Sequence, residues 1–525
     1  MGLRRILLVD WSRFRIRGFL LSIARIGKGI TYIVFLNAIQ FIVGILFYNI
    51  LSRMLEPAEI GIYSTLTFIL VILTTVAPLA LQFAAVKYIS MHLGNGDEDK
   101  AAAVAHTSSR IVLYSSSALF IIFVVIVYIL GQTWASVRNI QILLFVTGAA
   151  GFFASIRTIH LAFIQALQLF DRYAVANLTA MAASRLFGIP FLLSGGGLLG
   201  AISGTLLGEC TGLLVTFLLY KNRLPSNKSE YDKKVLIRFS LPILAMMVVA
   251  MMQDWSDRII FLGISSNLEA LGVFDLAIKA ATSLGIIGAV LDVVVFPRFS
   301  ESYGRSGRQA LSGMMTRALR YLGLMYFPAA FGLASISRTA MTVLYQARLA
   351  SEGNVPLMIL AIFSILGAFT TILNSGLKSI GKTSAFLNIS LSALAVDATI
   401  VILLSPHLRL YGAVVARAAS TTVAFIYTLW LARKDIPFQL DHMGLVKVLA
   451  SSLFLVPPVL LTEYMVFLPN PFLKLGVEVL VAVASYVAGL FLFKTLRRED
   501  LYIMRQILPA RMSSAIVALE KFLVK

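Results

Sequence analysis

The sequence predicts an all-α membrane protein that crosses the bilayer about fourteen times. Of its 525 residues, 59% are hydrophobic and only 13% are charged, whereas typical soluble domains contain about 25% charged residues. The apolar residues also occur in runs of roughly 20, the helix length that spans a hydrocarbon core. A soluble fold with this composition would expose far too much apolar surface.

The hydrophobic runs and the loop charges together give a topology. We expect spans near 30–52, 60–83, 107–131, 139–165, 172–193, 197–220, 235–256, 269–295, 314–336, 354–377, 383–405, 411–432, 446–468 and 473–494. A cytoplasmic N-terminus then places 33 of the 45 Lys and Arg residues on the inner side and seven on the outer side. Because inner loops carry the excess of basic residues, both termini are expected in the cytoplasm and the protein in the cell membrane. The net charge of +20 thus indicates orientation, and no nucleic-acid partner is expected.

Residues 1–28 precede the first span and carry seven basic residues. Basic residues interrupt the apolar ones throughout, and no small-residue cleavage site follows, so a cleaved targeting signal is not expected. The segment fits an amphipathic helix lying on anionic lipids of the inner leaflet. A plain positive-inside anchor is the alternative.

Three stretches of the chain recur about 211 residues further on. The matched pairs are Gly61 and Gly272, Lys87 and Arg298, Gly96 and Gly307, and Gly200 and Gly412. Each match is weak alone, and chance similarity among apolar helices is the alternative. A repeat divides the chain into an N-lobe (29–222), a linker (223–234), a C-lobe (235–434), two additional helices (446–494) and a basic tail (495–525).

Each predicted repeat contains six spans, so the chain returns to the same side of the membrane after each copy. The two lobes are therefore expected to be parallel copies related by an axis along the membrane normal. Two six-helix lobes around a midplane site are typical of alternating-access transporters. The repeat therefore predicts transport.

Four strings of the sequence resemble a known family. They are SRMLEPAEIGIYS (52–64), KYISMHLGNGDEDKA (87–101), DRIIFLGISSNLEALGVFDLAIK (257–279) and FPRFSE (296–301). They resemble the oligosaccharide (O-antigen-type) flippases of the multidrug/oligosaccharidyl-lipid/polysaccharide exporter superfamily. The resemblance implies that a polyprenyl-(pyro)phosphate-linked glycan is moved from the cytoplasmic leaflet to the outer leaflet.

A basic and an acidic residue lie four positions apart in the eighth predicted span. Asp275 and Lys279 share a helical face, and a charge at mid-membrane requires a partner or a water-filled cavity. One hypothesis is a mutual ion pair that allows insertion. The other is a cavity-lining pair, in which Lys279 binds the pyrophosphate and Asp275 sets its charge state. The family resemblance favours the second.

Further arginines within or beside the spans are candidates for binding a diphosphate, because guanidinium matches phosphate oxygens bidentately. Arg417 is flanked by alanines, which gives its side chain room to reach a cavity. The others are equally suited to capping a carbonyl or pairing with Glu209, or, at span ends, to snorkelling at the interface. These are Arg157, Arg185 and Arg53. Arg53 and Arg258 mark the outer ends of spans one and seven, where the alternative to snorkelling is that they guard the exit.

Acidic residues within or next to the spans are candidates for coupling to a proton or sodium ion. Asp397 has no obvious charged neighbour in its span, and Glu209 and Asp257 complete the candidate set. A protonated, hydrogen-bonded carboxyl group is the alternative for Asp397.

Other function classes fit the sequence less well. The single cysteine, Cys210, and five scattered histidines form no metal-ligand pattern, so no metal or cofactor is expected. A membrane polymerase or glycosyltransferase generally needs a large outer loop with catalytic carboxylates, whereas the longest outer loop expected here (337–353) contains one, Glu352. No catalytic residues are therefore assigned. A multidrug or cation antiporter of the same superfamily is the main alternative.

Overall fold

The computed structural model describes residues 39–40, 42–130, 140–221, 223, 229–345, 347–382 and 385–497. Every regular element in these ranges is a helix, which confirms the predicted all-α class. The predicted amphipathic segment 1–28 and nearly all of the basic tail 495–525 lie outside the described residues.

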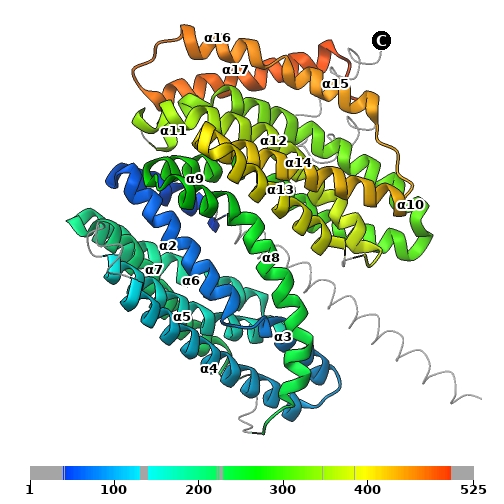
Figure 1. The fold of residues 1–525 in the computed structure, drawn as a ribbon. Helices are drawn as coiled ribbons and strands as arrows, with labels where there is room; N and C mark the ends of the chain where they lie inside the picture. Colours follow the sequence, from blue (N-terminus) through cyan, green and yellow to red (C-terminus); the bar gives the residue numbers. More distant parts are fainter. Residues whose placement is uncertain are drawn as a thin grey trace, which may run out of the picture. The chain divides into compact units, whose positions relative to one another are not determined.

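The helices follow one another with short connections (Figure 1). After the helix Ile42–Met54 they are, in chain order, α2 (Pro57–Val76), α3 (Leu81–Gly94), α4 (Glu98–Leu130), α5 (Ile140–Ala166), α6 (Phe170–Phe191), the π-turn η1 (Leu192–Gly196), α7 (Gly197–Tyr220), α8 (Lys233–Ser265), α9 (Leu268–Thr282), α10 (Gly285–Ser335), α11 (Ser337–Leu344), α12 (Ala347–Ser379), α13 (Ala385–Leu408), α14 (Leu410–Asp435), α15 (His442–Leu453), α16 (Val456–Met465) and α17 (Pro471–Leu492).

The length and composition of these helices make this a multi-pass membrane protein. Among the described residues, ten helices are long and apolar enough to cross a membrane, or eleven if Gly307–Ser335 and Ser337–Leu344, bent by 78°, form one span. In this number the stretch Phe170–Tyr220 stands as one helix. The sequence predicts two spans within that stretch, and they are separated at Gly195, whose φ is +92°. The number fourteen stays a prediction.

One compact unit comprises Met1–Leu55 and Ile62–Met251 and is called unit 1. In it α6 packs on α7, α7 on α5, and α5 on α4 (Figure 1). The backbones of α6 and α7 approach closely because α7 carries a glycine every four residues, at positions 200, 204, 208 and 212. A Cβ atom on Gly204 would lie 2.3 Å from Gly188 Cα. Small residues at this spacing are typical of close helix packing in membranes.

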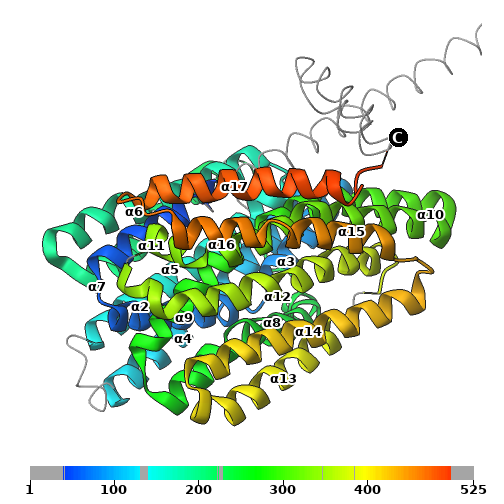
Figure 2. The ribbon, with the colours of Figure 1, turned by 90° about the horizontal axis from the view of Figure 1, so that it is seen from above.

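The second compact unit, unit 2, comprises Glu56–Gly61 and Met252–Lys525. Within it α12 packs on both α10 and α14, and α13 packs on α14. The last helices, α15 to α17, lie against α10 and α11 (Figures 1 and 2). The boundary between the two units falls within α8, after the predicted linker. The lobe limits given by the sequence stay a prediction.

Two glycines matched by the proposed repeat pack reciprocally inside unit 2. A Cβ atom on Gly61 would lie 2.0 Å from the Leu268 carbonyl oxygen, and one on Gly272 would lie 2.2 Å from the Pro57 carbonyl oxygen. Gly61 and Gly272 are 211 residues apart, and so are Pro57 and Leu268. A two-fold relation between matching segments produces this reciprocity, so the contact supports the predicted repeat.

We expect Gly272→Ala to lower the melting temperature of the purified protein clearly. The added methyl group would overlap the Pro57 carbonyl oxygen, and relieving such a clash in a packed interior typically costs about 1–3 kcal/mol. Gly263→Ala in α8 is the matched control, because nothing lies within 4 Å of its Cβ position. If both variants melted with the wild type, the close contact between α9 and Pro57 would be wrong.

Candidate functional site

The central part of the site in unit 2 is built by four helices. The α8 segment 254–258 places Asp254 and Arg258 one helical turn apart on one face. Helix α9 contributes Asp275 and Lys279, α13 contributes Asp397, and α14 contributes Arg417. The start of α9 is fixed by Asn267, whose side-chain oxygen accepts a hydrogen bond from the Ala270 amide at 2.9 Å.

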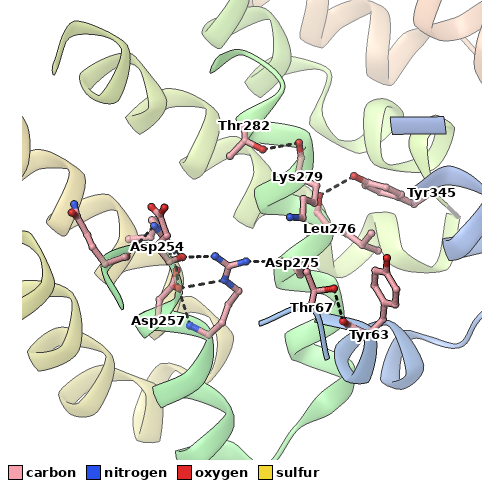
Figure 3. A network of polar contacts seen from close by, with 12 residues as sticks. Tyr63, Thr67, Asp254, Asp257, Asp275, Leu276, Lys279, Thr282 and Tyr345 are labelled. Carbon is pink, nitrogen blue, oxygen red and sulfur yellow. Dashed lines mark hydrogen bonds and ion pairs between the residues drawn. The ribbon is translucent and has the colours of Figure 1, made fainter. Parts of the chain in front are cut away.

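Arg258 lies buried at the centre of this group, with 6% of its surface exposed. Its guanidinium donates to Asp275 Oδ1 at 2.9 Å and lies 3.6 Å from Asp257 Oδ1. The same group stacks on the Trp255 ring, 3.8 Å from the ring centroid. Figure 3 shows Asp257 and Asp275 in this network of polar contacts. Two carboxylates and an aromatic ring thus fix one buried cation.

Arg417 also binds the Asp257 carboxylate. Its Nε donates to Asp257 Oδ2 at 2.8 Å and its second terminal nitrogen donates to Asp257 Oδ1 at 2.9 Å, the bidentate geometry that guanidinium and carboxylate favour. Asp257 is fully buried and is held between two arginines. This geometry favours a structural role for Asp257 in orienting both guanidiniums over the role of an ion-coupling site.

Four of these charged residues border a cavity of about 480 Å³ inside unit 2. Three basic side chains, Arg258, Lys279 and Arg417, and one carboxylate, Asp254, line it. Hydroxyl groups of Thr282, Ser364, Thr371 and Thr421 and the ring of Tyr326 complete its polar wall. Asp257 and Asp275 are not among the residues that line the cavity, but they bind two arginines that are. The cavity therefore presents mostly cations to a ligand.

Asp397 is fully buried next to this network. Its Oδ2 accepts a hydrogen bond from the Ser256 hydroxyl, whereas its Oδ1 has no hydrogen-bond partner within the described residues. A buried carboxylate with one unpaired oxygen is unfavourable when ionised. The geometry thus makes Asp397 the most suitable proton carrier of the three acidic candidates.

Unit 1 contains a second cavity, of about 330 Å³. Arg157 and Glu209 form an ion pair on its wall, with Nε to Oε2 at 2.6 Å and a second bond to Oε1 at 3.2 Å. Arg185 lines the same cavity, and its guanidinium carbon lies 3.6 Å from the Phe47 ring centroid. Pairing of Arg157 with Glu209 was one of the alternatives that the sequence left open.

The structure differs from the sequence analysis at three candidates. Asp275 binds Arg258, a partner 17 residues earlier, whereas a mutual ion pair with Lys279 and a cavity-lining pair were the two hypotheses for it; Lys279 lines the unit 2 cavity and Asp275 does not. Arg258 is buried and paired with Asp275, which does not fit the snorkelling position that was one of its two alternatives. Arg53 is exposed, and its Nε donates to Asn49 Oδ1 at 3.2 Å; it lines neither cavity.

No group of three or more His, Cys, Asp and Glu side chains suited to a metal ion occurs among the residues that the structure describes. The acidic residues of unit 2 instead bind arginines. The chemistry of the site is therefore that of charged and hydroxyl groups facing a cavity.

Residues 50–350 match the sequence family described as polysaccharide biosynthesis proteins. The match covers more than half of the chain and includes α8 and α9, which supply most of the charged network. The chain belongs to this family. A search of curated protein sequences finds no match.

Solved structures with the same fold are transporters. The lipid II flippase MurJ in an inward closed conformation is 15% identical, with a TM-score of 0.61 over 82% of this chain and 98% of that chain. An inward-facing multidrug resistance MATE family transporter of the MOP superfamily is 15% identical, with a TM-score of 0.63 over 74% and 93%. A MOP superfamily transporter from Pyrococcus furiosus is 14% identical, with a TM-score of 0.55 over 78% and 95%. With the family match, these folds confirm the resemblance to the exporter superfamily.

Proposed function

We propose that the protein is a flippase for a polyprenyl-(pyro)phosphate-linked glycan. It moves the glycan headgroup from the cytoplasmic to the outer leaflet of the cell membrane by alternating access, with both termini in the cytoplasm. The family match to polysaccharide biosynthesis proteins and the fold shared with a lipid II flippase support this proposal. It involves transport without catalysis.

The observation that carries the proposal is the set of three basic side chains on the wall of the unit 2 cavity. Arg258 and Arg417 are held in place by carboxylates behind them, so their remaining donors are preorganised. Lys279 adds a third positive charge on the same wall. A diphosphate carries several negative charges and many acceptor oxygens, so it satisfies this arrangement through charge-assisted hydrogen bonds.

A multidrug or cation antiporter is the second candidate, and one feature favours it. Asp254 also lines the unit 2 cavity, and a carboxylate there attracts a cation. Together with the buried Asp257, Asp275 and Asp397, Asp254 gives this network four acidic groups beside its three basic ones. The similarity to MATE transporters is equally consistent with this function.

The charge count suggests how either function could be coupled to ion flow. The network is neutral when one of its four carboxyl groups is protonated, and Asp397 has the unpaired oxygen. We propose that Asp397 carries this proton. Glu209 and Asp257 use both of their oxygens to bind arginines, so neither is proposed as the coupling site.

A liposome assay distinguishes the two functions. Purified protein would be reconstituted with a labelled polyprenyl-diphosphate-linked oligosaccharide, and the fraction of headgroups accessible to a membrane-impermeant enzyme would be followed over time. A flippase raises this fraction, because headgroups from the opposite leaflet also become accessible to the enzyme. Exchange of a cationic dye for protons without any headgroup translocation would instead establish the antiporter.

In this assay we expect Lys279→Ala to slow headgroup translocation about tenfold or more, because a hydrogen bond to a charged group contributes about 1.5–3 kcal/mol. Lys279→Arg keeps the charge and should retain much of the activity. Lys434→Ala is the control, since this exposed lysine in α14 lies outside the cavity lining. Unchanged translocation in Lys279→Ala would remove Lys279 from the binding site.

A further inference from the structure

The cavities of unit 1 and unit 2 are lined by residues at matched positions of the predicted repeat. Five pairs of lining residues are 211 or 212 residues apart: Thr67 and Ile278, Leu70 and Ala281, Arg157 and Ala368, Thr205 and Arg417, and Glu209 and Thr421. The matched glycine and basic residues that define the repeat have the same offset, and they line neither cavity. Each unit therefore contains a cavity at an equivalent place in its own fold.

The charges at the matched positions differ between the two cavities. Where unit 2 has Arg417, unit 1 has Thr205, and where unit 2 has Thr421, unit 1 has Glu209. The Arg157–Glu209 pair, at 2.6 Å, compensates its own charge. Arg185 is the remaining basic residue among those lining the unit 1 cavity. This wall is thus much less suited to a multiply charged diphosphate than that of unit 2.

Most other polar groups on the unit 1 wall are neutral: Gln40, Tyr48, Tyr63, Thr67, Thr147, Asn177, Ser184 and Thr205. Hydroxyls of three threonines donate to carbonyl oxygens of their own helices, so they offer acceptor lone pairs to a ligand. Arg185 Nε is buried and has no acceptor within the described structure, so a ligand oxygen could satisfy it.

Aromatic rings complete this lining. Tyr48 and Tyr63 both border the cavity, and their ring centroids are 6.1 Å apart at an angle of 78°. Figure 3 shows Tyr63, whose backbone carbonyl oxygen accepts a hydrogen bond from the Thr67 hydroxyl. Aromatic faces beside hydroxyl, amide and guanidinium groups suit a ligand with an apolar C–H face and a rim of hydroxyl groups. A pyranose ring has both.

We propose that the unit 1 cavity is a sugar-binding subsite that recognises a residue of the glycan. This inference rests on the proposed flippase function and deepens it, because the unit 2 cavity then binds the diphosphate. The volume of about 330 Å³ lies within the range of about 300–1,000 Å³ found for small-molecule pockets. The two matched cavities therefore differ in chemistry: the lining of the unit 2 cavity suits a charged group, and the lining of the unit 1 cavity suits hydroxyl groups.

Binding of two probes by native mass spectrometry tests the proposal. The probes are a polyprenyl diphosphate without sugar and the same carrier bearing an oligosaccharide. In the unit 1 variants Arg185→Gln and Thr205→Val, we expect the Kd of the sugar-bearing probe to rise about tenfold, in line with the loss of a charged hydrogen bond. The Kd of the sugar-free probe should stay within about twofold. Lys279→Ala in unit 2 should raise the Kd of both probes.

The control is Thr211→Val, which removes a hydroxyl from α7 outside the cavity lining and should bind both probes as the wild type does. Equal weakening of both probes by the unit 1 variants, or no weakening of either, would overturn the sugar subsite. So would a wild-type protein that binds both probes with one Kd. A wild-type protein that binds neither probe would instead overturn the flippase function itself.

Discussion

Asp257→Asn is expected to abolish transport and to lower the melting temperature strongly. Asp257 is fully buried and accepts two hydrogen bonds from Arg417 and one from the Arg258 amide. Asparagine keeps the shape but removes the charge that compensates two guanidiniums. Breaking a buried ion pair by removing one partner typically costs about 3–5 kcal/mol. Differential scanning fluorimetry and the liposome assay would measure the two effects.

A matched variant and a double variant separate stability from function. Asp254→Asn, one turn earlier, should change stability less, because Arg417 and Arg258 bind the Asp254 backbone carbonyl, which the substitution keeps. Adding Arg417→Gln to Asp257→Asn removes both charges of the pair and should recover most of the stability. Transport should stay lost, since Arg417 lines the cavity. A stable, fully active Asp257→Asn protein would contradict the network.

The sequence was sufficient to predict the helical membrane class because each hydrophobic run contains its own signal. It placed Lys279 and Arg417 in the site for a similar reason, since a charge inside a span requires a cavity or partner wherever the helix lies. The partner of Asp275 could not be predicted this way. Arg258 lies on the preceding helix, and which charges meet depends on how α8 and α9 pack.

The cavity of unit 1 depends on a pattern that the sequence does contain. Glycines at every fourth position of α7, from 200 to 212, bring α6 close to α7 and so place Arg185 and Glu209 beside one cavity. Of these four glycines, only Gly200 belongs to a matched pair of the predicted repeat. A search for small residues at four-residue spacing would have predicted the contact, whereas the bidentate geometry of Arg157 and Glu209 requires the three-dimensional packing of α5 on α7.

Glu209→Ala is the second substitution for which we expect a large effect. The Glu209 and Arg157 side chains are only 17% and 14% exposed, so the substitution leaves a largely buried guanidinium without its carboxylate partner, with Asn177 Oδ1 as its remaining acceptor at 3.3 Å. The expected loss is about 3 kcal/mol, the lower end for buried pairs. It would appear as a decrease in melting temperature together with weaker binding of the sugar-bearing probe, because both residues line the unit 1 cavity.

The ion pair between Arg110 and Glu230 is the matched control for this second prediction. Its nitrogen–oxygen distance is 2.7 Å, but its side chains are 45% and 49% exposed, and exposed ion pairs contribute little to stability because water solvates each partner. Glu230→Ala should therefore leave the melting temperature and binding of both probes unchanged. The double variant Arg157→Met/Glu209→Leu should regain stability, because no unpaired charge remains buried, while its binding of the sugar-bearing probe stays weak. If the stable double variant bound that probe with wild-type affinity, the ion pair would only support the fold. Arg185 and the neutral polar groups alone would then form the sugar subsite.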